Sequence, residues 1–219
     1  MALTKYNYNS FNVTPVASKA LAFNSGANGL TTATAGSMVL IKTLTASSSS
    51  TLSFVDGASD VVLDNTYPIY LFKFIDIHPS NDSVDFQFNL SIDAGSNYNV
   101  TKTTTFFRAY HTEDGAAAEL QYQAAEDLAQ GTGFQSLADR QDNDNDSSCA
   151  GTLHLFNPSS TTFVKHFMSV MDRVFGGSAT QANDFMGGYG NTTSAVDAIQ
   201  FKFSAGNIDA GTIKMYGVL

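Results

Sequence analysis

The chain of 219 residues contains a single cysteine, Cys149. A single cysteine can form neither an internal disulfide framework nor a cysteine metal cluster. Its scarcity fits synthesis in a reducing cytoplasm. No basic residue stands close enough to Cys149 in the sequence to lower the pKa of its thiol, so we do not expect a reactive cysteine there.

Charged residues are also scarce, at 14% of the chain, and basic residues are the fewer of the two kinds. The sequence has 11 Lys and Arg against 20 Asp and Glu, which gives a net charge of −9. A nucleic-acid-binding surface normally shows as a basic excess. An anionic membrane surface would repel an acidic protein. Neither nucleic acid nor a membrane is therefore an expected partner.

Long apolar runs are absent from the sequence. A transmembrane helix needs about 18 or more consecutive apolar residues, and no stretch approaches that length. The first residues, MALTKYNYNSFNV, lack the uninterrupted apolar segment of a secretory signal. We therefore expect a protein without a membrane span that is made in the cytoplasm, and that leaves a cell, if it does, by another route.

The common catalytic and cofactor motifs are missing as well. There is no G-x-S-x-G nucleophile elbow, no P-loop and no G-x-G-x-x-G that opens a helix after a strand. The four histidines do not match the H-E-x-x-H pattern of zinc enzymes and are expected to be structural: His78, His111, His154 and His166. The sequence predicts no catalytic residue, no cofactor-binding residue and no cofactor.

One acidic string invites a metal-binding interpretation, namely Asp142-x-Asp144-x-Asp146. An EF-hand loop would continue with Gly at its sixth position and Glu at its twelfth. Ser147 and Leu153 stand there, so the EF-hand interpretation fails. A solvated acidic loop is the better explanation, although a looser calcium site stays open. We assign no metal ligand.

Residues typical of β-structure are abundant, with 22 Thr, 23 Ser, 17 Phe and 9 Tyr. The clearest strand is VDFQFNLS, in which Val84, Phe86, Phe88 and Leu90 alternate with polar residues. Similar alternation recurs in roughly eight to ten segments, with no strand–helix–strand rhythm. The sequence therefore predicts an all-β protein, an antiparallel β-sandwich of jelly-roll-like topology.

Residues 37–219 are expected to form this single sandwich domain, and residues 1–36 an N-terminal arm or peripheral segment. Residues 113–150 interrupt the alternation with many carboxylates, which predicts a short helical or irregular acidic insertion, although a strand through Leu120 and Tyr122 also fits. Two hairpins are predicted, one from residues 84–92 and 97–111 and one from residues 201–218. In the second, Ile213 and Met215 should face the core.

The glycine-rich stretch FMGGYGNTT around Tyr189 has two interpretations. It is either a tight β-connection in which glycine supplies unusual backbone angles, or a recognition loop whose aromatic side chains contact a sugar or a protein.

Four stretches carry a family resemblance: FKFIDIHPS, SIDAGSNYNVTKTTTFFRAYHTE, GTLHLFNPSSTTFVKHF and GYGNTTSAVDAIQFKFSAGNIDAGTIKMYGV. Together they resemble virion structural proteins of tailed phages of marine bacteria, cyanophage-like phages among them, over residues ~50–219. The resemblance implies a particle component and brings no catalytic residues with it.

The expected function is therefore a non-enzymatic structural protein of the phage virion. It would be a head decoration or cement protein or part of the tail apparatus, made in the host cytoplasm. Its expected partners are copies of itself, such as a trimer, and other virion proteins. The alternative is a receptor- or carbohydrate-binding module of a tail fibre, with a host-surface glycan as ligand.

Overall fold

The computed structural model describes residues 19–23, 26, 29–34, 37–175 and 179–219. The chain divides into two compact units, Met1–Val39 and Leu40–Leu219. In the first unit, β1 (Lys19–Phe23) and β2 (Leu30–Thr34) pair as an antiparallel hairpin. Most of the predicted arm over residues 1–36 lies outside the described residues.

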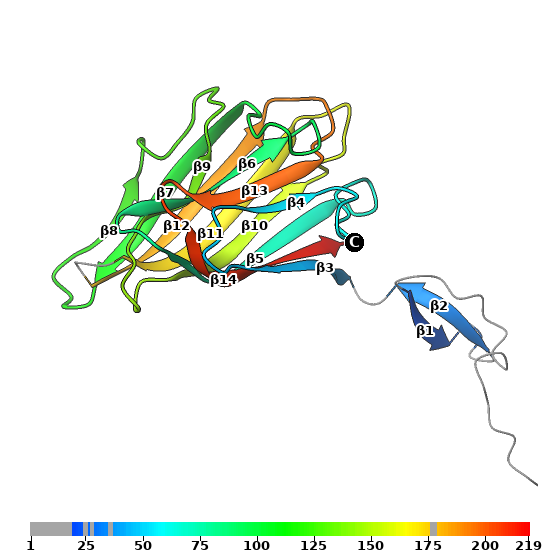
Figure 1. The fold of residues 1–219 in the computed structure, drawn as a ribbon, viewed down its shortest axis with the longest axis horizontal. Helices are drawn as coiled ribbons and strands as arrows, with labels where there is room; N and C mark the ends of the chain where they lie inside the picture. The colour runs from blue at the N-terminus through cyan, green and yellow to red at the C-terminus, as the bar shows by residue number, and fades with distance from the viewer. Residues whose placement is uncertain (1–18, 24–25, 27–28, 35–36, 176–178) are drawn as a thin grey trace, which may run out of the picture. The chain divides into compact units, whose positions relative to one another are not determined.

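The larger of two sheets in the second unit has eight strands in the order β3-β14-β5-β10-β11-β12-β7-β8 (Figure 1). Every pairing given between them is antiparallel. Their bounds are β3 Met38–Thr45, β5 Ile69–Pro79, β7 Lys102–Thr112, β8 Ala118–Tyr122, β10 Cys149–Phe156, β11 Lys165–Phe175, β12 Thr180–Gly190 and β14 Ile208–Val218.

The smaller sheet has four antiparallel strands in the order β4-β13-β6-β9 and lies against one face of the larger sheet (Figure 1). These strands are β4 (Leu52–Val55), β6 (Val84–Ser91), β9 (Gln135–Gln141) and β13 (Ala198–Phe203). The prediction of an all-β, antiparallel sandwich is confirmed. The strand order does not establish the jelly-roll topology.

Phenylalanine fills the space between the sheets at the β4–β13–β6 side. Phe201 of β13 lies 5.4 Å from Phe72, 5.2 Å from Phe74 and 6.0 Å from Phe86 between ring centroids. Most of these pairs are tilted or edge-to-face, the arrangement that aromatic quadrupoles favour. The residues that point into the core are the apolar ones of each alternating strand, as expected when successive side chains of a strand point to opposite faces.

The acidic segment around residues 113–150 contains strands instead of a helix. Of the alternatives left open by the sequence, the strand through Leu120 and Tyr122 is present as β8, and β9 follows an irregular stretch. No helix occurs in the described ranges, so the helical alternative fails, whereas the irregular one fits residues 123–134 between β8 and β9. Among the described residues, no helix is long and apolar enough to span a membrane.

Both predicted hairpins are wrong, because their strands belong to different sheets. β6 is in the smaller sheet and β7 in the larger, and β13 and β14 are divided in the same way. Each short connection crosses the sandwich instead of turning back within one sheet. β14 pairs with β5, while β13 pairs with β4 and β6. Ile213 and Met215 are fully buried, as predicted.

Candidate functional site

The outer face of the eight-stranded sheet, the face turned away from the smaller sheet, carries the candidate site. Alternate residues of β11, β12 and β7 point outward, and the pairing places them in rows across the sheet. One row joins Thr103 of β7, Tyr189 of β12 and His166 of β11. The next joins Thr105, Gly187 and Met168.

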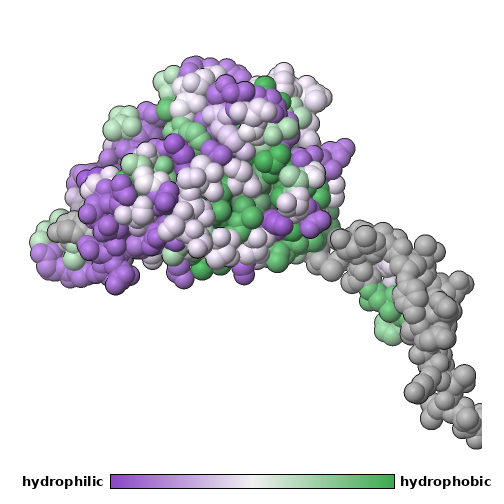
Figure 2. All heavy atoms as spheres, viewed as in Figure 1, coloured by the Kyte–Doolittle hydropathy of each residue, from purple (hydrophilic) through white to green (hydrophobic). Residues whose placement is uncertain are grey.

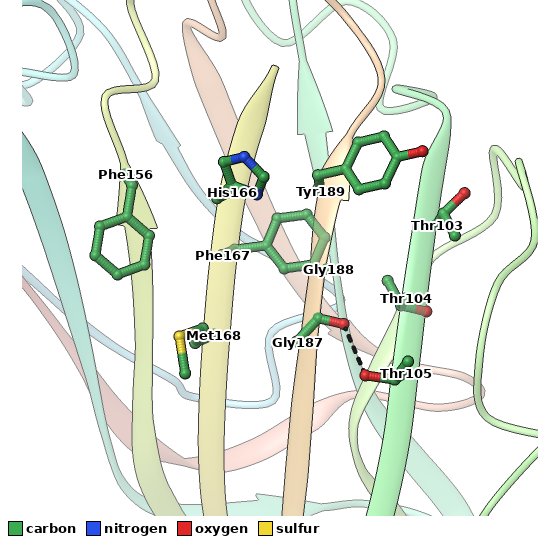
Figure 3. Close-up of a pocket in the computed structure, with 10 residues that line it drawn as sticks. All are labelled: Thr103, Thr104, Thr105, Phe156, His166, Phe167, Met168, Gly187, Gly188 and Tyr189. Carbon is green, nitrogen blue, oxygen red and sulfur yellow. Dashed lines mark hydrogen bonds between the residues drawn. The ribbon is translucent and has the colours of Figure 1, made fainter. Parts of the chain in front are cut away.

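These two rows enclose a groove of about 490 Å³ (Figure 3). Gly187 forms its floor, because a glycine stands where the flanking strands carry Met168 and Thr105. Figure 3 shows Met168 and Phe156 on one side of this floor and Thr105 on the other. The Thr105 hydroxyl donates a hydrogen bond of 3.4 Å to the Gly187 carbonyl.

Tyr189 stands at one end of the groove, and its position corrects the sequence interpretation. FMGGYG is the last part of the eleven-residue strand β12, so Tyr189 lies on a strand and not in a loop. Its ring centroid is 6.2 Å from that of His166, with the rings tilted by 56°. The regular strand conformation also rules out the tight turn that glycine was expected to serve.

A neutral hydrogen-bond network borders the Tyr189 end, and Gln130 is its centre. The Gln130 side-chain amide donates to the hydroxyls of Thr103 at 2.6 Å and of Tyr189 at 3.4 Å. Its carbonyl oxygen accepts a bond of 2.7 Å from the Asn191 amide. These contacts link the β7, β12 and residue 130 segments, so they hold the tyrosine ring in place.

A second hollow of about 540 Å³ adjoins the groove and shares Phe156 and His166 with it. Its other lining residues are Asn157, Thr162, Phe163, Val164 and Thr193. The lining of both hollows contains no Asp, Glu, Lys or Arg. Together they form a long, uncharged depression with aromatic, aliphatic and hydroxyl side chains, which we call the outer groove.

The ionisable groups that are buried lie elsewhere, between the two sheets. Arg108 and Arg173 from the larger sheet bind Asp139 of β9, and Arg173 also binds Asp184 of β12. All four are buried, so this charged cluster joins the sheets without being open to a substrate. Asp139 belongs to the segment of residues 113–150 that was expected to be an acidic insertion, and its burial places part of that segment in the interior of the sandwich.

Two lysines are buried at the opposite end of the same sheet. Lys102 donates to the Asn89 side-chain oxygen at 2.5 Å and to the Val100 carbonyl at 2.8 Å. Lys165 donates to the carbonyls of Phe163 and Thr192. Burial lowers the pKa of both amines, that of Lys102 to about 7. The oxygens that accept hydrogen bonds from the two ammonium groups are neutral. They satisfy the N–H donors but do not balance the positive charges.

Cys149 is fully enclosed, and burial raises the pKa of its thiol well above the ordinary range. The register places Arg173 opposite it, a basic neighbour that the sequence could not reveal. Its positive charge lowers the pKa of the thiol, but burial is the larger influence. The thiol therefore stays protonated, as a structural cysteine does.

The Asp142-x-Asp144-x-Asp146 loop is held by internal contacts. Asp142 accepts a 2.8 Å hydrogen bond from the Ser83 backbone N–H. The Asp144 carbonyl lies 3.1 Å from the His78 ring nitrogen, which gives that histidine a structural contact. Within the described ranges, no group of three His, Cys, Asp or Glu side chains is placed to hold a metal ion.

The outer groove was missed because Gly187, Gly188 and Gly190 made a strand look like a loop. One signal could have revealed the strand, because two series of residues alternate along β12. They are Gln181, Asn183, Phe185, Gly187 and Tyr189 on one face and Ala182, Asp184 and Met186 on the other.

No known protein family, curated protein or solved structure matches the chain, so no relative assigns a role to the groove.

Proposed function

We propose that the protein is a non-enzymatic structural component of a tailed-phage particle, and that its copies associate through the edges of the eight-stranded sheet. The observation that carries the proposal is the exposure of both edge strands. β3 and β8 each pair with one neighbour only in the described sheet, and they lie at opposite edges (Figure 1). The family resemblance supports the location on a virion.

An unpaired edge presents a row of free N–H and C=O groups that another strand can pair with. Monomeric proteins usually block such edges with charges, prolines or bulges. β8 does the opposite on the outer face, where Leu120 is 69% and Tyr122 57% exposed. Its one charged side chain, Glu119, accepts a hydrogen bond from Tyr110. Apolar side chains thus flank this free edge.

β3 has a similar character, with Leu40 51% exposed and Lys42 as its only charged residue. On the face seen in Figure 2, hydrophobic residues gather toward the β5 and β14 side of the sandwich, whereas hydrophilic residues cover the β7–β8 side. A contact between β3 of one copy and β8 of the next is heterologous, and it forms a closed ring, such as a trimer, when the rotation between copies closes. β3 and β8 themselves carry one charged residue each, Lys42 and Glu119, which limits the desolvation cost of that contact.

Sedimentation and mass photometry of the full chain test the assembly. We expect an oligomer that dissociates when Leu40 and Leu120 are both replaced by Lys, because buried charges would oppose strand pairing. Ile92→Lys, at another exposed apolar position outside the sheet edges, is the matched control and should leave the oligomer intact. A wild-type chain that stays strictly monomeric at micromolar concentration would argue against the assembly.

The virion location has its own test. Mass spectrometry of purified particles of the encoding phage should find the protein in many copies, and cryo-EM density should place it on the head or the tail. Particles that lack it would contradict this part of the proposal without affecting the sheet-edge contact.

A further inference from the structure

Gly187 has no structural reason to be a glycine. Its backbone is in an ordinary strand conformation, and an added Cβ would meet only the Phe167 carbonyl oxygen, at 4.0 Å. Glycine inside a strand is less favourable than alanine, because it loses more conformational freedom on folding. Such a residue often marks a place where a ligand or another backbone comes close to the strand.

The neighbouring glycine provides the contrast. An added Cβ at Gly188 would lie 2.5 Å from the Thr103 carbonyl oxygen, so packing alone requires a glycine there. Backbone packing therefore explains why residue 188 is a glycine. At residue 187 the only consequence of glycine is the open space that it leaves on the outer face. That space is the floor of the outer groove.

The side chains around this floor fit a flat ring with one apolar face. The rings of Phe156, His166 and Tyr189 and the Met168 side chain supply apolar surface (Figure 3). Tyr189 is held by Gln130, so its ring is a fixed surface on which a ligand can stack. Thr103 and Thr105 supply hydroxyl groups along the opposite side.

The absence of charged side chains from the lining limits which class of ligand the outer groove can bind. The lining has no cationic side chain that is always charged, so a phosphate, a nucleotide or an acidic sugar would find no counter-charge. The net charge of −9 adds a general repulsion of anions. The lining has no carboxylate either, so an ammonium group would find no counter-charge there. A neutral ligand is the complement of this surface.

We propose that the outer groove binds a neutral glycan, with one sugar ring over Gly187 and the next in the adjoining hollow beside Phe163. A pyranose has an apolar C–H face and a rim of hydroxyl groups, which match the aromatic surface and the Thr and Asn side chains of the lining. The two hollows, of about 490 and 540 Å³, provide space for consecutive rings. This binding does not depend on the sheet-edge contact.

Titration of the full chain with neutral gluco-, galacto-, manno- and N-acetylhexosamine trisaccharides tests the proposal, followed by NMR or calorimetry, with sialylated and uronate sugars alongside. We expect at least one neutral trisaccharide to bind and the acidic ones not to bind. Gly187→Val should reduce binding at least tenfold, since its side chain fills the floor without straining the backbone. Tyr189→Ala should have a similar effect.

Gly133→Val is the matched control, because an added Cβ there meets nothing within 4 Å and Gly133 does not line the groove. Its binding should equal that of the wild type, and thermal unfolding should show that all three variants remain folded. Unchanged binding in both Gly187→Val and Tyr189→Ala, or no neutral sugar bound at all, overturns the proposal. A changed particle mass of Gly187→Val in sedimentation also overturns it, because the groove would then be a contact between copies.

Discussion

Arg173 of β11 and Asp184 of β12 bind each other in the interior of the sandwich, with 2.5 Å between Nε and Oδ2 and neither side chain exposed. The same guanidinium also binds Asp139 of β9, so the pair links the larger sheet to the smaller one. Burial raises the pKa of Asp184 to about 6 even though Arg173 opposes that shift. The cluster thus joins β7, β11 and β12 of the larger sheet to β9 of the smaller one.

Removing the arginine should destabilise the fold strongly. Arg173→Met leaves the Asp139 and Asp184 carboxylates in the interior with less compensation, and we expect the free energy of unfolding to fall by about 3–5 kcal/mol. Urea denaturation measures the change. Adding Asp184→Leu to Arg173→Met should recover part of the lost stability, since it removes one of the two buried carboxylates that have lost their arginine partner.

Arg140 offers the matched control for this measurement. It also binds Asp139, but its side chain is half exposed, and exposed ion pairs contribute about 0–1 kcal/mol. Arg140→Met should therefore change stability little. Equal losses in the two variants would mean that burial does not set the strength of these contacts.

The buried Lys102 amine predicts that stability rises with pH above neutrality. The folded amine loses its proton near pH 7, whereas an unfolded lysine keeps it to about pH 10.4. Between these values the unfolded chain binds more protons, so the free energy of unfolding increases with pH. Urea denaturation at pH 7, 8 and 9 should show this increase, and a smaller one in Lys102→Met. Identical slopes in the two proteins would refute the assignment.

The strands of this fold could be predicted from alternation, because an inward position must be apolar wherever one face is buried. VDFQFNLS illustrates this, since Val84, Phe86, Phe88 and Leu90 are all buried in β6. Alternation says nothing about which strand is the neighbour. The sheet that each strand joins therefore escaped prediction, and adjacent strands such as β13 and β14 were expected to pair.

The charged cluster escaped for a related reason. Asp139 was counted with its acidic neighbours, although residues 135–139 are all buried in β9. Arg173 occupies the inward series with Phe167, Ser169 and Met171, so the same alternation places it in the interior. Its partners come from β12 and, across the sandwich, from β9, and ion pairs between sheets leave no spacing signal in a sequence.

The aromatic core predicts a large loss on truncation at its centre. Phe201→Ala removes a fully buried ring that contacts the rings of Phe72, Phe74 and Phe86, and we expect a loss of about 3–5 kcal/mol. Phe163→Ala is the control, since Phe163 is 70% exposed and should change stability by less than about 0.5 kcal/mol. Denaturant midpoints compare the two. A small effect of Phe201→Ala would show that the neighbouring rings collapse into the space.

The strand β14 should be indispensable to the fold. β14 lies between β3 and β5 in the larger sheet, and Ile213 and Met215 are fully buried. Deleting residues 212–219 removes those side chains and leaves the β5 edge unpaired, so we expect no cooperative unfolding transition in circular dichroism or calorimetry. Deleting Leu219 alone, which is 57% exposed and follows β14, should leave the transition unchanged. A soluble truncated chain with a native-like spectrum and a cooperative transition would show that the sandwich forms without its terminal strand.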